Sequence, residues 1–438
     1  MAAVATTFPD LPIRRNTALL AGVMAVNSAV LQLVAAVSSL TFVLVTGFEA
    51  LLGLGPAIFL VSSALTAVPA GRLMDSLGRV PVIAGGFALG AVGCWLTALG
   101  TAVESAPAVI LGFALVGASG GISLLVRTAA GDMYPQDRRA RGISYVLFGA
   151  VFGAILGPAV FSPIFSGKDE LAADVLTIPW IVAGFISLIA LGLALAVRPD
   201  PKQIAELIAS HAGEATTGPA APLREIIRRP GVIPALVAGF ASMGVMVSVM
   251  NLTGYVVVDH RHHAQHLIFP IIGAHVLGMY ALVLFVGTLI DRIGRIRALS
   301  GGLVIMAVAC AGMQWLEGVA ATAVLLFLLG LGWNLSFVAS TAQLADRASP
   351  AERGKLLGFN DLGSAMLGAS LALLGGVVLE ALGVAALVLG SAALVVLPVV
   401  WIWRQSMGAG GFEPPKAEPT GLQPVPFGHS GTPPGERP

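Results

Sequence analysis

The sequence predicts an all-α membrane protein with twelve transmembrane helices, on the basis of its composition, its apolar runs and its placement of basic residues. Of the 438 residues, 56% are hydrophobic and 11% are charged, whereas a soluble domain carries about 25% charged residues. So little polar surface cannot cover a soluble fold of this length. The formal net charge of +1 argues against the broad basic field of a nucleic-acid-binding protein. Two cysteines exclude a disulfide framework and a multi-cysteine metal cluster.

Twelve runs have the length of about 20 mostly apolar residues that crosses a bilayer. The first six predicted helices cover 17–43, 51–71, 80–102, 106–128, 142–165 and 176–197. The second six cover 232–258, 267–289, 297–317, 320–344, 354–380 and 382–403. The run after Arg14-Arg15 is too long for a cleavable signal peptide, so we expect it to be the first helix.

Basic residues fall almost entirely at the two ends of the chain and in the even-numbered loops. These loops hold Arg72, Arg79, Arg138, Arg139, Arg141, Arg198, Lys202, Arg224, Arg228, Arg229, Arg292, Arg295, Arg297, Arg347, Arg353 and Lys355. The opposite loops hold only Lys168 and Arg261. The positive-inside rule therefore predicts a multi-pass protein of the cell membrane with both termini in the cytoplasm.

These boundaries divide the chain into two six-helix bundles with cytoplasmic extensions. The predicted parts are a cytoplasmic N-terminus at 1–16, bundles at 17–197 and 232–403, a cytoplasmic linker at 198–231 and a tail at 404–438. The tail is rich in glycine and proline, so we expect it to be disordered.

The two halves of the chain repeat each other. The segment 71–79 (GRLMDSLGR) matches 287–295 (GTLIDRIGR) at glycine, aspartate, glycine and arginine, with 216 residues between equivalent positions. A second pair, PQDR from Pro135 and PAER from Pro350, is separated by 215 residues. Parallel six-helix repeats related by an axis along the membrane normal are typical of one class of transporter.

The doubled motif G-x-L-x-D-x-x-G-R resembles the signature loop of the major facilitator superfamily, and the resemblance covers 17–403. It implies two bundles that rock around a central site by alternating access. It assigns gating roles to Gly71, Asp75, Gly78 and Arg79, and to Gly287, Asp291, Gly294 and Arg295. Glycine permits a tight turn and close helix approach, and Asp75 can accept hydrogen bonds from a helix N-terminus. The alternative is that these charges only set the topology.

Asp361 is the candidate coupling residue. It lies eight residues after Arg353, which is about 12 Å along a helix and inside the membrane. A carboxylate there can alternate between protonated and ionised forms, and a structural pair with a nearby asparagine or arginine is the alternative. Arg127 lies about one turn before Asp132, so we expect it near the cytoplasmic end of its helix.

Intramembrane amides are candidate residues of a substrate cavity, because polar groups in a bilayer tend to be functional. They are Asn27, Gln32, Asn251, Asn334 and Asn360. Hydrogen bonds between helices would also explain them.

The glycines at 149, 153 and 157 with Pro158 resemble the motif of proton-linked drug exporters, although Ala159, Val160 and Phe161 replace its later glycines.

A soft-ion path is a further candidate site. Met246 and Met250 on the seventh helix, and His275 and Met279 on the eighth, are each spaced by one turn. Thioether sulfur and imidazole suit Cu(I), and the histidine-rich loop 259–266 could capture a metal ion. Methionine is also a common core filler, so packing is the alternative.

Together these methionine and histidine pairs resemble the bacterial copper importers that supply cytochrome oxidase assembly. The segments 332–334 (GWN) and 358–361 (GFND) are also similar to that branch. Riboflavin importers resemble the same branch, so the resemblance leaves the substrate open between copper and an organic solute.

The resulting prediction is a secondary transporter of a small solute, coupled to an ion gradient, with protons as the expected ion. A non-transporting membrane receptor is the alternative of another class. The sequence contains no Walker-type motif and no paired nucleophile and base, so we do not expect an enzyme. We expect no cofactor, with Cu(I) only as a possible transported substrate. The expected partners are the lipid bilayer, the solute or metal ion and protons, with no nucleic acid, and we expect a functional monomer.

Overall fold

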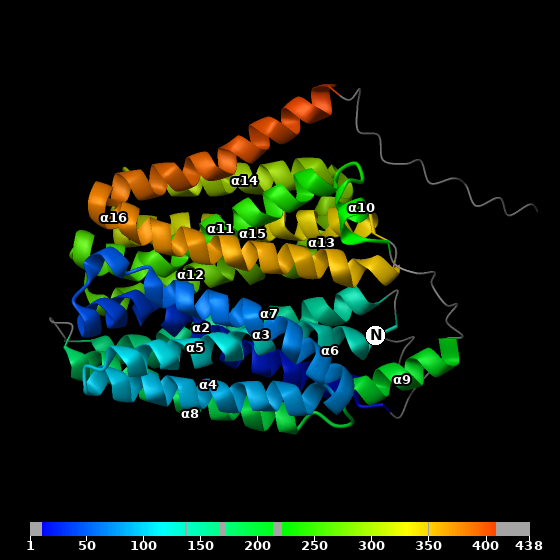
Figure 1. The fold of residues 1–438 in the computed structure, drawn as a ribbon, viewed down its shortest axis with the longest axis horizontal. Coiled ribbons are helices and arrows are strands. Elements are labelled where there is room, and N and C mark those ends of the chain that lie inside the picture. The colour runs from blue at the N-terminus through cyan, green and yellow to red at the C-terminus, as the bar shows by residue number, and fades with distance from the viewer. Residues whose placement is uncertain (1–10, 136–137, 167–171, 213–220, 349, 409–438) are drawn as a thin grey trace, which may run out of the picture.

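The computed structural model describes residues 11–135, 138–166, 172–212, 221–348 and 350–408, and within them it is helical without strands (Figure 1). The predicted all-α class is therefore confirmed. The predictions made for 1–10 and for most of the tail concern residues outside the described part of the chain, as does Lys168.

The described residues of the N-terminal half form seven α-helices and one short 3-10 turn. They are α2 (Ile13–Thr46), η1 (Glu49–Leu51), α3 (Leu54–Leu77), α4 (Arg79–Ala102), α5 (Ala106–Ser123), α6 (Val126–Asp132), α7 (Arg139–Phe165) and α8 (Ala173–Leu195). Helix α2 packs on α7 and α8, while α4 packs on α5 and α8. The α4–α5 contact needs Gly112, because a Cβ there would overlap the Thr97 hydroxyl, as expected where small residues let helices approach closely.

The C-terminal half repeats this arrangement after a linker that contains two helices, α9 (Pro201–Ala212) and α10 (Leu223–Ile227). Its elements are α11 (Val232–Tyr255), η2 (Val256–His260), η3 (Gln265–Leu267), α12 (Ile268–Tyr280), α13 (Val283–Ile293), α14 (Arg295–Gly312), α15 (Val319–Asp346) and α16 (Pro350–Gly408). Helix α11 packs on α16, and α15 packs on α12 and α14.

Ten of the described helices are long and apolar enough to cross a membrane, or eleven if the bent pair α12 and α13 forms one span. The longest apolar stretch, Lys355–Arg404, has 50 residues. Within it Gly383 adopts φ 78° and ψ −179°, so two helices meet there. The twelve spans and the orientation of the termini remain predictions.

Two predicted continuous helices are broken in the structure. The run 106–128 is interrupted at Leu124 and Leu125, where the Leu125 N–H donates to the Ile122 carbonyl and tightens the turn. The run 267–289 is interrupted at Ala281 and Leu282, and its two parts are bent by 42°. Apolar residues continue through both breaks, so hydropathy alone does not reveal them.

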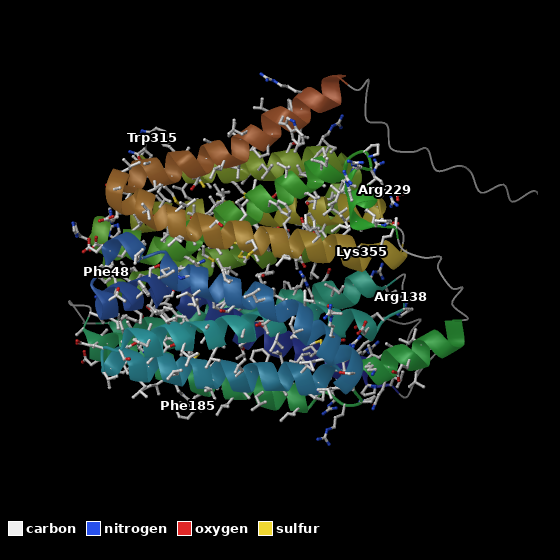
Figure 2. The ribbon with its side chains drawn as sticks, in the orientation of Figure 1. Phe48, Arg138, Phe185, Arg229, Trp315 and Lys355 are labelled. Atoms are coloured by element: carbon white, nitrogen blue, oxygen red, sulfur yellow. The ribbon has the colours of Figure 1, made fainter. Side chains whose placement is uncertain are left out.

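The bundle has one end rich in basic residues, called here the basic end. Figure 2 shows Arg138, Arg229 and Lys355 at this end, and Phe48 and Trp315 toward the opposite end. The linker helices α9 and α10 also lie at the basic end (Figure 1).

The two halves pack tightly near the opposite end. The Ser162 hydroxyl donates to the His266 carbonyl at 2.6 Å, and the Phe161 ring stacks on Phe269 with centroids 5.6 Å apart. Helices α2 and α11 approach so closely that a Cβ on Gly254 would overlap the Ala36 carbonyl oxygen. This packing closes the space between the halves at that end.

Candidate functional site

The repeated loops place equivalent ion pairs in the two halves. The Arg79 Nε lies 2.8 Å from the Asp132 carboxylate, and the Arg295 Nε lies 3.2 Å from the Asp346 carboxylate. Each pair joins the loop to the helix that ends beside it. The first pair is less exposed than the second, whose Asp346 side chain is 55% exposed, so the first is better shielded from solvent screening.

The backbone N–H groups at the start of α4 donate to the side chain of Asp200, a linker residue that the sequence did not reveal as a candidate. Its carboxylate accepts the N–H groups of Arg79 at 3.0 Å, Val80 at 2.8 Å and Lys202 at 2.8 Å. One side chain therefore caps both α4 and α9. The Asp-Pro pair at 200–201 is a helix-start signal that could have revealed it.

The glycines of the repeated loops differ in their roles. Gly78 adopts φ 102°, and a Cβ there would lie 2.8 Å from the Asp200 carboxylate, while Gly294 adopts φ 87°. A Cβ on Gly71 or Gly287 meets nothing within 4 Å, so the expected close helix approach does not occur at these two positions. The side chains of Asp75 and Asp291 lie outside the described part of the chain.

The linker is also joined to the C-terminal half by an ion pair and hydrogen bonds. The Arg229 guanidinium donates to both oxygens of Glu352, at 2.7 and 2.9 Å, and to the Arg347 carbonyl at 2.9 Å. Glu352 also accepts the Ala221 N–H at 3.2 Å. The carboxylate raises the pKa of Arg229, so the guanidinium stays charged at any working pH. Glu352 belongs to the repeated PAER segment, which was the only sequence signal for this contact.

The candidate coupling residue Asp361 forms an ion pair with Arg127 across the two halves. The Arg127 Nη2 lies 2.6 Å from Asp361 Oδ2, and the side chains are 32% and 41% exposed. The Asn360 amide lies 3.5 Å from the other Asp361 oxygen. Arg127 belongs to α6, after the break in the fourth span, and reaches the partner that we placed inside the membrane. This pairing with an arginine and an asparagine is the alternative that the sequence left open for Asp361.

Aromatic side chains of α12 and α15 pack on one another in the C-terminal half. The Trp333 ring stacks on Phe337 with centroids 5.0 Å apart, and Tyr280 meets Trp333 at 6.2 Å. The indole N–H of Trp333 is buried and has no hydrogen-bond partner among the described residues. These rings therefore form one aromatic cluster that contains a buried donor without a described partner.

The five candidate cavity amides are all buried. The Gln32 amide donates to the Gly153 carbonyl at 2.6 Å, Asn334 donates to the Met279 carbonyl, and Asn251 donates within its own helix to Val247 at 2.8 Å. Asn27 is 8% exposed. Packing accounts for these bonds, and a cavity role remains a prediction.

The glycines of α7 pack on α2, since a Cβ on Gly149 would overlap the Ala21 carbonyl oxygen.

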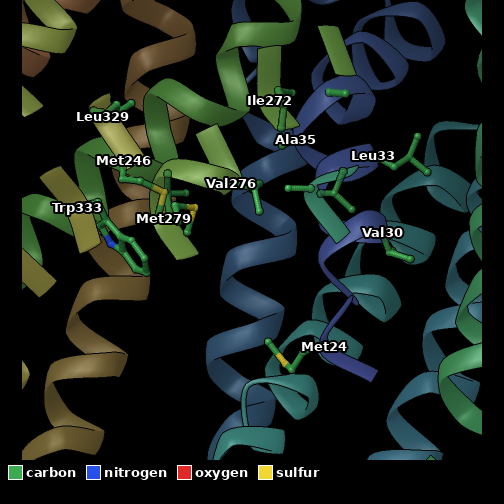
Figure 3. Packing of buried hydrophobic residues seen from close by; sticks show 14 of the residues in the cluster. Met24, Val30, Leu33, Ala35, Met246, Ile272, Val276, Met279, Leu329 and Trp333 are labelled. Atoms are coloured by element: carbon green, nitrogen blue, oxygen red, sulfur yellow. The ribbon is translucent and has the colours of Figure 1, made fainter. Parts of the chain in front are cut away.

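The candidate soft-ion residues are in the packed core. Met246 and Met279 lie in the same region as Trp333 (Figure 3), with 4% and 7% of each residue exposed. Met250 is partly buried. The His275 Nδ1 lies 2.8 Å from the Leu326 carbonyl oxygen, while its Nε2 is buried without a partner. A metal role for these residues remains a prediction.

The histidine-rich loop does not gather its side chains into one group. The His263 Nε2 lies 3.0 Å from the Glu317 carbonyl oxygen, and His260 lies 3.5 Å from Asp259. Burial lowers the pKa of Arg261, which donates to the Thr322 hydroxyl at 2.7 Å. Among the residues that the structure describes, no three His, Cys, Asp or Glu side chains form a metal-binding cluster.

Comparison with known proteins agrees with this architecture. The riboflavin transporter RfnT of Brucella anthropi is 30% identical over 357 residues, which cover 80% of this chain and 85% of RfnT. The MFS-type transporter YdeG of Bacillus subtilis is 29% identical over 367 residues, which cover 82% of this chain and 84% of YdeG.

A solved structure and a sequence profile extend the comparison to the whole bundle. The xylose transporter XylE from E. coli, in a partially occluded inward-open conformation, has a TM-score of 0.67 at 14% identity and covers 90% of this chain and 97% of XylE. The Major Facilitator Superfamily profile matches residues 17–274 and 258–434. This chain therefore belongs to the Major Facilitator Superfamily of secondary transporters.

Proposed function

We propose that this chain carries a small organic solute across the cell membrane by alternating access, coupled to a proton gradient. The observation that supports this most is the ion pair between Arg127 and Asp361. It joins the two halves within the spanning region, where a charged pair is costly and tends to be functional. The relationship to a riboflavin transporter supports an organic solute over an inorganic ion.

The proposed topology has twelve spans with the basic end in the cytoplasm. The positive-inside rule supports this orientation. The break at Gly383 supports counting the long α16 as two spans, and the bent pair α12 and α13 counts as one. A single chain contains both halves, so we propose a functional monomer.

The mechanism that we propose opens the two ends alternately. The structure has its halves packed together near the opposite end, through contacts such as Phe161 on Phe269. The Arg127–Asp361 pair bridges the halves through two side chains that remain partly exposed. A proton on Asp361 would remove its charge and weaken this bridge, so that protonation changes the free energy of the two states unequally.

Replacing Asp361 by asparagine is expected to abolish uptake driven by a pH gradient while solute exchange continues. The substitution keeps the shape of the side chain but removes the site at which a proton binds. We would reconstitute the full chain into liposomes and measure riboflavin and aromatic-acid uptake, with an internal pH dye reporting proton entry. Glu206→Gln, an exposed change in α9, is the matched control.

Gradient-driven uptake at the wild-type rate in Asp361→Asn would remove this carboxylate from the coupling step. The double variant Arg127→Gln/Asp361→Asn leaves no unpaired charge and shows whether any loss reflects misfolding. Wild-type protein that binds a solute but moves none would contradict transport and favour a receptor.

Cu(I) is the second candidate substrate, because the unpartnered His275 Nε2 and two buried methionines occupy one half of the bundle. The variant Met246→Leu/Met250→Leu is expected to abolish Cu(I) accumulation if the sulfurs bind the ion. A packing role alone predicts a loss below about 1.5 kcal/mol of stability and normal uptake. Met306→Leu, fully buried in α14, is the control. Copper uptake equal to that of wild type in the double variant, or no copper uptake by wild type, would contradict the metal hypothesis.

A further inference from the structure

Asn360 and Asp361 are consecutive residues of α16 with different surroundings. The Asp361 side chain is 41% exposed and meets Arg127 of the N-terminal half, whereas Asn360 is 1% exposed. An α-helix has about 3.6 residues per turn, so the two side chains leave it about 100° apart. Asn360 therefore faces the interior of the C-terminal half, while it adjoins the carboxylate that we propose to carry the proton.

The Asn360 amide lies where α16 meets α11 and α15. A Cβ on Gly239 of α11 would lie 2.8 Å from Asn360 Oδ1 and 2.9 Å from Ser340 Oγ of α15. The Ser340 hydroxyl is fully buried and donates to the Ala235 carbonyl at 2.7 Å. Because Gly239 has no side chain, it leaves the space in which the asparagine oxygen lies.

The orientation of this amide is set by its nitrogen. Asn360 Oδ1 is buried without a hydrogen-bond partner among the described residues, which is unfavourable for a polar atom. Asn360 Nδ2 lies 3.5 Å from Asp361 Oδ1, and hydrogen bonds to an ionised group are stronger than those between neutral groups. The attraction between the carboxylate and the N–H group therefore explains why the oxygen is left unpaired.

The Asp361 carboxylate is thus held at both of its oxygens. Arg127 Nη2 lies 2.6 Å from Asp361 Oδ2, and the Asn360 amide lies beside Oδ1. Arg127 belongs to the other half and moves with it in the proposed cycle, whereas Asn360 is packed into the same half as Asp361. The asparagine is therefore the contact that remains when the ion pair opens.

We infer that Asn360 is a positioning residue for Asp361, whose carboxylate it keeps in one orientation whether or not Arg127 is paired with it. Gly239 supports this role by leaving room for the Asn360 oxygen. The inference rests on the proposed proton coupling and adds two residues to that site. It differs from a packing role, because packing requires the volume of Asn360 and not its N–H group.

Infrared difference spectra of the purified full chain in lipid test this contact at a fixed pH. Wild type minus Asp361→Asn isolates the carboxylate stretch of Asp361, whose frequency depends on its hydrogen bonds. We expect Asn360→Leu, which keeps the volume, and Asn360→Ala to shift this band. Gly239→Ala should shift it in the same direction, because the added Cβ would meet the movable end of the Asn360 side chain. Adding Gly239→Ala to Asn360→Ala should cause no further shift.

The same variants are measured for transport in the liposome assay described above. Proton-driven uptake should fall about threefold or more in Asn360→Leu and in Gly239→Ala, as for the loss of one hydrogen bond, while solute exchange continues. Asn360→Ser keeps a donor and should lose less.

Three matched variants separate this contact from general packing. Gly244→Ala, also in α11, places a Cβ 2.9 Å from Leu371 Cδ1, and Ser364→Ala removes a buried hydroxyl one turn after Asn360. Ser340→Ala removes the other polar atom that a Cβ on Gly239 would meet. All three should keep the band at its wild-type frequency.

A band that stays at the wild-type frequency in Asn360→Leu and Gly239→Ala would overturn the inference, as would a further shift when Gly239→Ala is added to Asn360→Ala. Proton-driven uptake by a protein whose band does not move in these variants would overturn this inference alone. A shifted band in a protein that moves no protons would support the contact and contradict the proposed function.

Discussion

Replacing Gly254 by alanine is expected to reduce transport about fivefold or more. The added Cβ would overlap the Ala36 carbonyl oxygen, a backbone atom of α2 that cannot rotate away. Overpacking of this kind costs about 1–3 kcal/mol, and about 1.4 kcal/mol changes an equilibrium tenfold. The overlap destabilises the conformation in which α2 and α11 pack together at the opposite end. That state becomes rare, so the transport cycle slows.

Spin labels at Phe48 and Trp315 measure this change directly. Both residues are exposed, belong to opposite halves and lie toward the same end (Figure 2). The remaining cysteines, Cys94 and Cys310, are buried and should not react. We expect a longer distance between the labels in Gly254→Ala. Gly192→Ala, where a Cβ meets nothing within 4 Å, should match wild type. Wild-type distances and transport in Gly254→Ala would contradict the close approach.

Replacing Asp200 by alanine is expected to destabilise the start of α4 and the linker together. The substitution removes the acceptor for three backbone N–H groups. Loss of one helix cap costs about 0.5–2 kcal/mol, so the two helices together lose about 1–4 kcal/mol. Hydrogen exchange of the Val80 and of the Lys202 amide should each accelerate about twofold to thirtyfold, and the Tm should fall.

Two further substitutions define the cause of that loss. Asp200→Asn keeps a capping oxygen and should recover most of the protection, because asparagine caps helices nearly as well as aspartate. Gln203→Ala, at an exposed position in α9, should leave both amides protected. Unchanged exchange in Asp200→Ala would show that the linker is not held to the loop by this carboxylate.

Local sequence features were sufficient for the class, the family and most helix positions. The apolar runs that predicted helices at 80–102 and 232–258 closely match α4 and α11, with its extension η2. Each of these helices is indicated by the hydropathy of consecutive residues, and the thickness of the bilayer sets the expected helix length. The breaks at Leu124 and Ala281 could not be predicted this way, because the residues around them are as apolar as those within the helices.

The contacts of the functional site could be predicted from the sequence less completely than the helices. Asp361 was predicted from its depth in a span, but its partner Arg127 lies 234 residues away. Asp200 and Glu352 attach the linker to opposite halves across comparable separations, with partners at Arg79 and Arg229. A repeat can indicate that such positions matter without indicating what they contact.

The sequence by itself determined that this is a helical, multi-pass member of a transporter superfamily, because hydropathy and the repeated loop depend on residue order alone. Only the tertiary structure decided which charges meet. The Arg127 side chain from α6 meets the Asp361 side chain from α16 because the two halves pack together, and no local rule specifies that approach.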